Sequence, residues 1–314
     1  MSRIAVAGYG AVGRAVVAQA TERGDEVRVI GRHEPAGLPK GAVFHRADMM
    51  VPESAANAVA GVDNVVLAVG IPYATATFVR DWPVAMRNTL GAVERGGNRL
   101  VFADNLYMYG PQTRPLTEDM PLTDYGQKPK ARAEITRLWQ TAHAEGRVRA
   151  TAVRAADFYG PNAATSVLSA YGIARMVEGR PALIPFPTTN PHDFTYVPDF
   201  ARALLTLVDA EDDAYGEAWH VPNAKPTQTP EELLKSAAEL IGTEPRIRVM
   251  PASAMTLIGV FNPIVRSLRE MRFQWDRPYV VDSSKFASRF WGEATPYRDG
   301  IASTIESYRR RSSG

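Results

Sequence analysis

The chain has 314 residues, of which 45% are hydrophobic and 22% are charged. These values are ordinary for a globular protein and exclude a disordered or fibrous chain, and the length allows one large domain or two moderate ones. Lys and Arg total 36 against 34 acidic residues, a balance that gives no reason to expect a nucleic-acid partner. The absence of Cys excludes disulfides, thiol catalysis and thiolate metal sites.

The sequence contains no recognisable signal peptide or membrane span. The first apolar run, Ile4–Ala7, is short. The most apolar stretch, Met250–Val265, is interrupted by Pro251 and Pro263 and is shorter than the about 20 residues that a spanning helix needs. We therefore expect a buried helix or the wall of a pocket there, a cytoplasmic location and no membrane partner. The basic tail Arg309–Gly314 is expected to fray.

The N-terminal residues carry the pattern of a dinucleotide-binding βαβ unit. Arg3–Ala7 predicts a buried strand, Arg14–Arg23 a helix with one apolar face, and Val27–Ile30 a second strand. The first glycine of the loop between strand and helix permits a tight turn, the second lets a pyrophosphate approach the backbone, and the third permits close helix packing. The phosphates would bind at the start of the helix, where N–H groups and the dipole attract anions. The loop reads Gly8-Tyr9-Gly10-Ala11-Val12-Gly13.

The residues after the second strand indicate which nicotinamide cofactor is preferred. An acid at this position binds the ribose 2′-hydroxyl of NAD, whereas a basic residue accommodates the 2′-phosphate of NADP. The strand is followed by Arg32, with no acid at the strand end. A guanidinium group can hold a phosphate through two parallel hydrogen bonds, so we expect NADP rather than NAD.

Further strands alternate with helices in the first half of the chain. A third strand is expected near Ala42–His45, with Asp48 after it either binding the adenine amine or capping the next helix. The wholly apolar run Val65–Val69 predicts a strand buried on both faces. A helix over Asp81–Glu94 and a strand over Leu100–Ala103 follow. This alternation predicts an α/β fold with a Rossmann-type, doubly wound parallel sheet. The end of the fourth strand should line the cofactor through Ala68, Val69 and Gly70.

Beyond the glycine loop, four features match one family. Asn88 stands in the middle of the helix before the fifth strand. Val101–Gly110 resembles a strand that ends in Ser-Ser and continues to Val-Tyr-Gly, Arg154–Pro161 resembles Arg-Pro-x-x-Val-Tyr-Gly-Pro, and His192–Asp199 resembles Arg-Asp-Phe-Val-Tyr-Val-Asp-Asp. Together these segments resemble the extended short-chain dehydrogenases/reductases, which include the NAD-dependent epimerases and dehydratases.

This resemblance implies a smaller, discontinuous substrate domain in the C-terminal part. Residues 1–161 would form the Rossmann domain, with its sheet completed by about residues 191–222, and residues 162–314 would mainly bind the substrate. The resemblance also implies a cofactor-binding role for Asn88 and favours a homodimer.

The catalytic signature of the family is altered in this sequence. The family uses a Ser or Thr together with a Tyr-x-x-x-Lys motif, in which the tyrosine transfers a proton and the lysine holds the ribose and favours the phenolate. Pro129 stands four residues after Tyr125. Alignment of the next segment, Ala131–Glu134, with the family instead places Lys130 in the lysine position and Gly126 in the tyrosine position. Asn105 occupies the serine position.

Three interpretations of this change remain open. In the first, Tyr125 still transfers the proton with Lys128 or Lys130 as its partner, because Pro129 is tolerated in the first turn of a helix. In the second, another tyrosine replaces it and Asn105 orients the substrate carbonyl. In the third, the chain binds the cofactor without redox chemistry. The replacement tyrosines would be Tyr107, Tyr73 or Tyr159.

The leading functional hypothesis is an NAD(P)-dependent oxidoreductase or epimerase-like enzyme that transfers a hydride to or from a small carbonyl or alcohol. The apolar composition of Met250–Trp275 favours a hydrophobic substrate. Arg266, Arg269 and Arg272 could instead bind the diphosphate of a nucleotide sugar, so a nucleotide-sugar epimerase or dehydratase is one alternative. A non-catalytic NADP(H) sensor is the other. The five His residues lack the spacing of a metal site, so no metal is expected.

Overall fold

The computed structural model describes residues 1–312. The chain divides into two compact units, each assembled from three stretches of sequence. Unit 1 comprises Met1–Met108, Leu122–Arg154 and Phe200–Trp219, and unit 2 comprises Tyr109–Pro121, Ala155–Asp199 and the chain from His220 onward. The assignment of the substrate to the C-terminal part of the chain stays a prediction.

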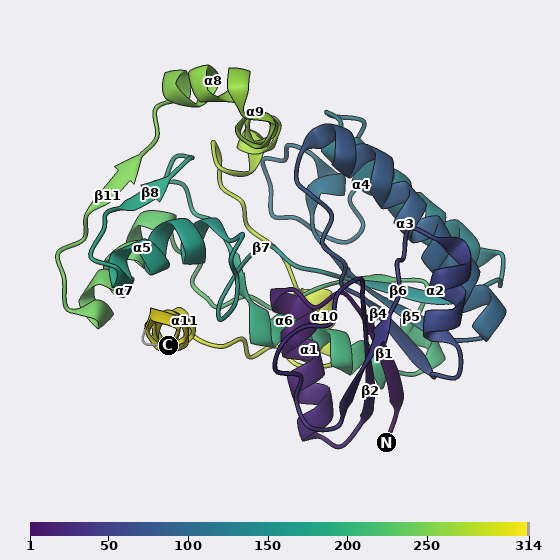
Figure 1. The fold of residues 1–314 in the computed structure, drawn as a ribbon. Helices are drawn as coiled ribbons and strands as arrows, with labels where there is room; N and C mark the ends of the chain where they lie inside the picture. Colours follow the sequence, from purple (N-terminus) through teal and green to yellow (C-terminus); the bar gives the residue numbers. More distant parts are fainter. Residues whose placement is uncertain (313–314) are drawn as a thin grey trace. The chain divides into compact units, whose positions relative to one another are not determined.

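Unit 1 is built on a seven-stranded sheet with the strand order β10-β6-β5-β4-β1-β2-β3 (Figure 1). The neighbouring strands from β6 to β3 all pair in parallel; Val6 of β1, for example, lies opposite Val29 of β2 and Val66 of β4. This sheet confirms the predicted Rossmann-type α/β fold. The strands are β1 (Arg3–Ala7), β2 (Glu26–Gly31), β3 (Ala42–Arg46), β4 (Asn64–Leu67), β5 (Arg99–Asp104), β6 (Arg149–Arg154) and β10 (Ala218–His220).

Helices cover both faces of this sheet, which explains why its central strands are apolar on both sides. Helices α2, α3 and α4 lie on one face, and α1 and α6 lie on the other (Figure 1). Trp82 and Trp139 contribute the largest buried side chains of the first layer. The helices are α1 (Ala11–Glu22), α2 (Pro52–Val59), α3 (Thr75–Gly96), α4 (Lys128–Ala144) and α6 (Val197–Val208), with short 3₁₀ turns η1 (Tyr107–Tyr109) and η3 (Asp212–Ala214).

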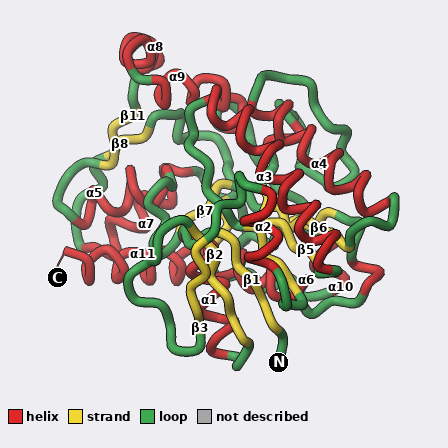
Figure 2. The backbone as a smooth tube through the Cα atoms, turned by 45° about the vertical axis from the view of Figure 1, so that its right-hand side comes forward, coloured by secondary structure: helices red, strands yellow, loops and turns green. Residues whose placement is uncertain are grey.

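Unit 2 is mainly helical and contains two short parallel strand pairs, β7 with β9 and β8 with β11 (Figure 2). Its strands are β7 (Asp157–Tyr159), β8 (Ala182–Ile184), β9 (Phe194–Tyr196) and β11 (Ile247–Val249). Its helical segments are the π-helical η2 (Val167–Ile173), α5 (Ala174–Val177), α7 (Pro230–Ile241), α8 (Ala252–Phe261), α9 (Pro263–Glu270), η4 (Met271–Gln274), α10 (Ser284–Arg289) and α11 (Tyr297–Ser312).

Helix α7 begins with the capping residues that helix N-termini prefer. Thr229 accepts a hydrogen bond from the N–H of Glu232, and the Glu232 carboxylate accepts one from the N–H of Thr229 at 2.7 Å. This reciprocal capping box, with Pro230 at the start of the helix, satisfies donors that a helix leaves unpaired.

Three sequence-based expectations about helices are wrong. Helix α3 begins at Thr75 rather than Asp81 and continues through Pro83, which is buried in its interior. The expected frayed tail is helical to Ser312, because α11 is anchored through Ile301 and Ile305 in the core of unit 2; residues 313–314 lie outside the described residues. Of the two expectations for Met250–Val265, the buried helix is wrong for most of α8, whereas the pocket wall is found at Met255 and Thr256. The sequence of α8 has no polar face that would mark its outward side.

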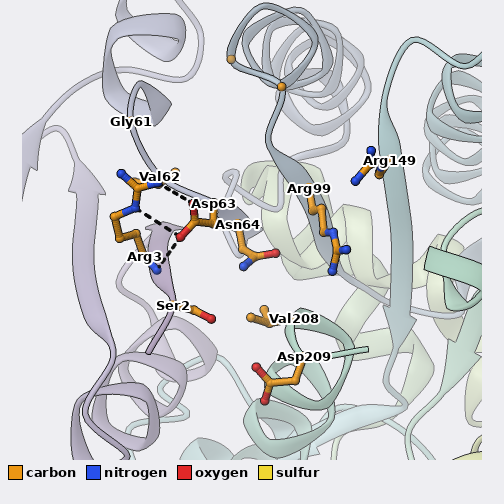
Figure 3. A pocket seen from close by; sticks show the side chains of 12 residues that line it. Ser2, Arg3, Gly61, Val62, Asp63, Asn64, Arg99, Arg149, Val208 and Asp209 are labelled. Carbon is orange, nitrogen blue, oxygen red and sulfur yellow. Dashed lines mark hydrogen bonds and ion pairs between the residues drawn. The ribbon is translucent and has the colours of Figure 1, made fainter. Parts of the chain in front are cut away.

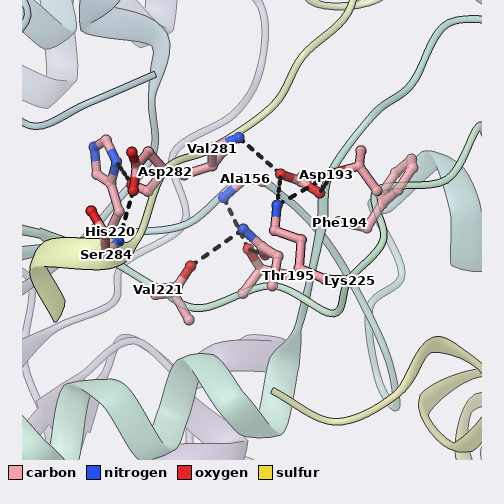
Figure 4. Close-up of polar contacts among 12 residues, drawn as sticks. Ala156, Asp193, Phe194, Thr195, His220, Val221, Lys225, Val281, Asp282 and Ser284 are labelled. Atoms are coloured by element: carbon pink, nitrogen blue, oxygen red, sulfur yellow. Dashed lines mark hydrogen bonds and ion pairs between the residues drawn. The ribbon is translucent and has the colours of Figure 1, made fainter. Parts of the chain in front are cut away.

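Asp193 joins three segments of unit 2 (Figure 4). Its fully buried carboxylate accepts hydrogen bonds from the Lys225 ammonium at 3.0 Å, the Thr227 hydroxyl at 2.7 Å and the N–H of Val281 at 2.8 Å. A buried charge is tolerated only when it is paired in this way. Asp193 is thus a structural residue of unit 2.

Replacing Asp193 with Ala should lower the free energy of unfolding by about 3 kcal/mol, because the substitution leaves buried donors without an acceptor. Urea unfolding followed by circular dichroism measures this loss. Asp63→Ala, which removes an exposed ion pair with Arg3, is the matched control. It should change the urea concentration at the unfolding midpoint little. Equal shifts in the two variants would contradict the structural role of Asp193.

Candidate functional site

The loop between β1 and α1 is the tightest part of unit 1. Gly8 has a φ of +102°, and a Cβ on it would collide with the carbonyl oxygen of Ala68, while a Cβ on Gly13 would collide with the carbonyl oxygen of Gly8. A Cβ on Gly10 would meet nothing within 4 Å. The outer glycines therefore bring strand and helix together, and the middle one keeps space open in front of the helix.

The start of α1 is suited to an anion. Gly10 is the N-cap residue, and the helix has neither a side-chain cap nor an acidic residue in its first turn. The first N–H groups, at Ala11, Val12 and Gly13, cannot all be satisfied within the helix, and the helix dipole adds partial positive charge. Tyr9 lies beside them, with the Arg14 guanidinium 4.4 Å from its ring centroid.

Two arginines lie together at the ends of β2 and β3. Arg32 follows β2 and is exposed. Arg46 is the last residue of β3, is also exposed, and stands opposite Gly31 in the strand register. Sequence analysis missed Arg46, although its place at the end of the third strand was a signal. The carboxyl ends of parallel strands lie at one edge of a sheet, so both cations lie on the edge that also carries the glycine loop of β1.

Asp48 and Asn88 both shape the loop after β3. The Asp48 carboxylate accepts the N–H of Met50 at 2.9 Å, and the Asn88 side-chain amide donates to the carbonyl of Met49 at 3.0 Å. Val51, not Asp48, is the N-cap of α2, so the alternative capping role of Asp48 is wrong. A direct contact of either side chain with a cofactor stays a prediction.

The segment after β4 runs along the same edge. The N–H of Ala68 donates to the carbonyl of Ala7 at 2.8 Å, which continues the pairing of β4 with β1 past the last residue of the strand. A Cβ on Gly70 would meet nothing within 4 Å. Ala68, Val69 and Gly70 therefore stand between the glycine loop and the end of β5.

Two tyrosines and a lysine meet at the end of β5. Lys128 is fully buried at the start of α4, and its ammonium lies 3.5 Å from the centroid of the Tyr73 ring. The Tyr73 hydroxyl donates to the Tyr107 hydroxyl at 3.5 Å. Both tyrosines are half-buried. Among the sequence-predicted candidates, the structure thus brings together Tyr73, Tyr107 and Lys128.

Asn105 is held beside Tyr107 by its own backbone contacts. Its amide oxygen accepts the N–H of Tyr107 at 3.0 Å, and its N–H donates to the Asp104 carboxylate at 2.9 Å. Within the described chain its side-chain NH₂ has no hydrogen-bond partner, so this group can donate to a ligand. Asn105 is half-buried, which leaves it accessible.

A buried ion-pair cluster underlies this group, and sequence analysis did not find it. Asp104 pairs with Arg132 at 3.1 Å and with Arg154 at 3.3 Å, and the Arg132 guanidinium stacks 3.8 Å from the Trp82 ring centroid. With Lys128 one helical turn before Arg132, three buried cationic side chains accompany one buried carboxylate. The cluster has an excess of positive charge, which favours a neighbouring anion or phenolate.

The remaining sequence candidates are placed differently. Tyr125 precedes α4 and is 44% exposed. Lys130 is exposed on α4, because a two-residue step turns a helix by more than half a circle from Lys128. Tyr159 belongs to unit 2, where it is buried against Tyr196 and Tyr297, and burial raises the pKa of Tyr159. These positions favour Tyr107 and Tyr73 over the other tyrosines.

A pocket in unit 1 lies at the opposite edge of the sheet (Figure 3). It has a volume of about 620 Å³ and is bordered by the amino ends of β1, β4, β5 and β6. Its charged side chains are engaged in ion pairs, such as Arg3 with Asp63 at 2.6 Å and Arg99 with Asp212 at 2.7 Å. In an open α/β sheet, ligands bind outside the carboxyl ends of the strands, so this pocket is not the candidate site.

Neither a metal centre nor a membrane span is found in residues 1–312. No group of three or more His, Asp or Glu side chains is arranged to hold a metal ion in this range. No helix in the same range combines the length and the apolar character needed to cross a bilayer.

Comparison with known proteins gives a family and a fold. The model of the NAD dependent epimerase/dehydratase family matches residues 4–221. No curated protein matches the sequence. Among solved structures, dTDP-glucose 4,6-dehydratase from Bacillus anthracis in complex with NAD is 15% identical with a TM-score of 0.81, over 100% of this chain and 98% of that one.

Two epimerase structures are similarly related. UDP-glucose 4-epimerase from Thermotoga maritima with UDP-glucose is 19% identical with a TM-score of 0.79, over 98% of this chain and 99% of that one. The UDP-glucose 4-epimerase complex with NAD from Thermus thermophilus is 20% identical with a TM-score of 0.77, over the same shares. At these identities the likeness concerns the fold.

Gly13→Ala should weaken dinucleotide binding about tenfold or more, because the added methyl group pushes α1 away from the Gly8 turn and moves the phosphate-binding N–H groups. Titration of intrinsic fluorescence with NADH and NADPH measures this loss. Gly91→Ala is the matched control, since a Cβ there meets nothing within 4 Å. It should bind normally and gain about 0.5–1 kcal/mol in stability. Normal binding by Gly13→Ala would contradict the role of the loop.

Proposed function

The chain belongs to the NAD-dependent epimerase/dehydratase family, a family of enzymes, and on this premise we propose that it transfers a hydride between a nicotinamide dinucleotide and a substrate carbon that bears a hydroxyl or carbonyl group. Family membership supports an enzyme over a purely regulatory role. The observation that carries the proposal is the meeting of Tyr73, Tyr107 and Lys128 at the end of β5, on the sheet edge that also carries the glycine loop.

The residues present fit a dinucleotide. The open space at Gly10 and the uncapped start of α1 suit a pyrophosphate, and the segment Ala68–Gly70 leads from this loop toward Tyr107. When bound, the cofactor supplies the hydride donor or acceptor. The residues of the chain then bind it, orient the substrate oxygen and transfer its proton.

Tyr107 is the proposed proton donor or acceptor at the substrate oxygen. It accepts a hydrogen bond from Tyr73, which stabilises a negative charge on its oxygen. Lys128 and Arg132 add positive charge nearby, and positive charge favours a phenolate. Asn105, two residues before Tyr107, donates its NH₂ group to the substrate oxygen, as amides do in oxyanion sites.

Tyr73 is better placed to assist than to react. Its ring face is covered by the Lys128 ammonium, and its hydroxyl is directed to Tyr107. Lys128 therefore acts on Tyr73 and Tyr107 together. It stands three residues after Tyr125, whereas the family motif places the lysine four residues after the tyrosine. The altered motif is compatible with catalysis if the tyrosine comes from η1, just after β5, instead of from the start of α4.

We propose a small carbonyl or alcohol as the substrate, with a nucleotide sugar as the second candidate. The second candidate is supported by the names of similar structures, which are UDP-glucose epimerases and a dTDP-glucose dehydratase. Turnover measured with small aldehydes and ketones beside UDP-glucose and dTDP-glucose separates the two. Turnover of the sugar nucleotides alone would overturn the first candidate. A homodimer and a cytoplasmic location stay predictions.

We propose NADP as the preferred cofactor, although similar structures contain NAD. Arg32 and Arg46 together form a site for a 2′-phosphate at the ends of β2 and β3. Arg32→Gln should raise the Kd for NADPH about tenfold, the value of a charge-assisted hydrogen bond, and change the Kd for NADH little. Fluorescence titration measures both. Lys40→Gln, an exposed change of the same charge before β3, is the control. Tighter binding of NADH by the unaltered protein would refute NADP preference.

Tyr107→Phe should reduce kcat about a hundredfold, the usual size of a general acid–base contribution, while the Kd for the cofactor stays unchanged. Tyr125→Phe removes a hydroxyl from an exposed tyrosine and should retain activity. Steady-state assays with the best substrate from the screen measure both variants. The opposite result, with activity lost only in Tyr125→Phe, would mean that Tyr125 rather than Tyr107 transfers the proton.

A further inference from the structure

Helix α8 exposes an apolar face that the proposed function does not use. Its ten residues, Ala252–Phe261, include no charged side chain. Leu257 is 68% exposed, Val260 62% and Phe261 85%, and Ile258 is also exposed. Contiguous exposed apolar side chains of this kind mark an interaction surface.

The inward face of α8 is fixed by two residues four positions apart. Met255 is buried in the core of unit 2. Gly259 packs on α9, where a Cβ would come within 3.2 Å of the Cα of Arg266. With this face held, Leu257, Ile258 and Phe261 are directed away from the core.

Three arginines accompany this apolar face. Arg266 and Arg269 lie on α9 and Arg272 lies in η4, and all three are exposed. Within residues 1–312 no hydrogen-bond or ion-pair partner engages their guanidinium groups. Arg269 and Arg272 also border a cavity of about 230 Å³ together with Met255 and Thr256 of α8, so the cations lie directly beside this helix. That volume is below the about 300 Å³ at which sites for drug-sized ligands begin.

We propose that the α8–α9 surface, defined as Leu257, Ile258, Val260 and Phe261 with Arg266, Arg269 and Arg272, binds the surface of an anionic phospholipid bilayer. The apolar side chains would enter the boundary between headgroups and acyl chains, and the guanidinium groups would bind lipid phosphates. The helix is too short to span a bilayer, so it lies in the plane of the surface. This proposal uses none of the residues of the proposed hydride-transfer site. It assigns to lipid phosphates the three arginines that the sequence analysis offered to a nucleotide-sugar diphosphate, and it revises the sequence-based expectation of no membrane partner.

The charges favour a lipid surface over a second copy of the chain. A two-fold contact through this surface would bring the same arginines of both copies together, and like charges in an interface oppose association. A lipid surface carries the complementary charge. Within unit 2, α8 lies at the outer end beyond the β8–β11 pair (Figure 1, Figure 2), and an outward helix with a terminal Phe suits insertion into a bilayer.

The test uses the full chain and sedimentation with vesicles of phosphatidylcholine alone or mixed with phosphatidylglycerol at about one part in three. The unaltered protein should bind the mixed vesicles at least about tenfold more tightly, and added salt should weaken this binding. Replacing Arg266, Arg269 and Arg272 with Gln should remove the preference for mixed vesicles, because each arginine contributes about fivefold to the binding affinity. Leu257→Ser with Phe261→Ser should weaken binding to both vesicle types.

Two control variants change the same chemistry elsewhere. Val43→Ser removes an exposed apolar side chain from β3, and Arg298→Gln removes an exposed cation from α11. Both should bind vesicles like the unaltered protein, and NADPH titration checks that every variant is folded. Failure of the unaltered protein to bind the mixed vesicles would overturn the proposal. Sedimentation of a dimer that Phe261→Ser dissociates would instead assign the surface to a second copy.

Discussion

The geometry of the candidate site depends on the charge balance around Asp104. Asp104 and Arg154 end the adjacent strands β5 and β6 and lie opposite each other in the register. Arg132 of α4 is also buried, and because an unpaired buried charge is costly, it lies against the same carboxylate. That requirement fixes the rotation of α4 about its axis. Lys128, one turn earlier on the same helical face, is consequently directed inward to the tyrosines, and Lys130 outward.

This fixed rotation also bears on the altered motif of the proposed site. A proline in the first turn of α4 costs no hydrogen bond there, so the helix can begin at Lys128. The tyrosine of the family motif would need to stand one further turn before the lysine, where this chain has an irregular segment with Tyr125 exposed. The turn η1, which follows β5, supplies another phenol in Tyr107. The proposed site thus combines a lysine from the helix that carries the family's lysine with a tyrosine from the turn that follows β5.

Sequence patterns predicted those features that depend on residues close together in the chain, and not those that depend on tertiary packing. The β1 loop depends on residues that are neighbours in sequence and is found where expected, and the capping box of α7 also has a local cause. The pairing of Asp104 with Arg132 depends on tertiary packing, and no periodicity separates Lys128 from Lys130. The exposure of Phe261 had no local signal either, because a helix that is apolar all round lacks the polar side that would reveal its outward face.

The place of β10 at the edge of the sheet affects how the chain is made. β10 pairs beside β6 but comes after β7, β8 and β9 in the sequence. During synthesis, about 60 residues separate the end of β6 from the start of β10. At a synthesis rate of about 5–20 residues per second, this gap takes several seconds. Over that time β6 is an unprotected edge strand whose N–H and C=O groups can pair with another nascent chain. Completion of the Rossmann sheet is therefore a late step, and the interval before it is when chaperone protection would matter most.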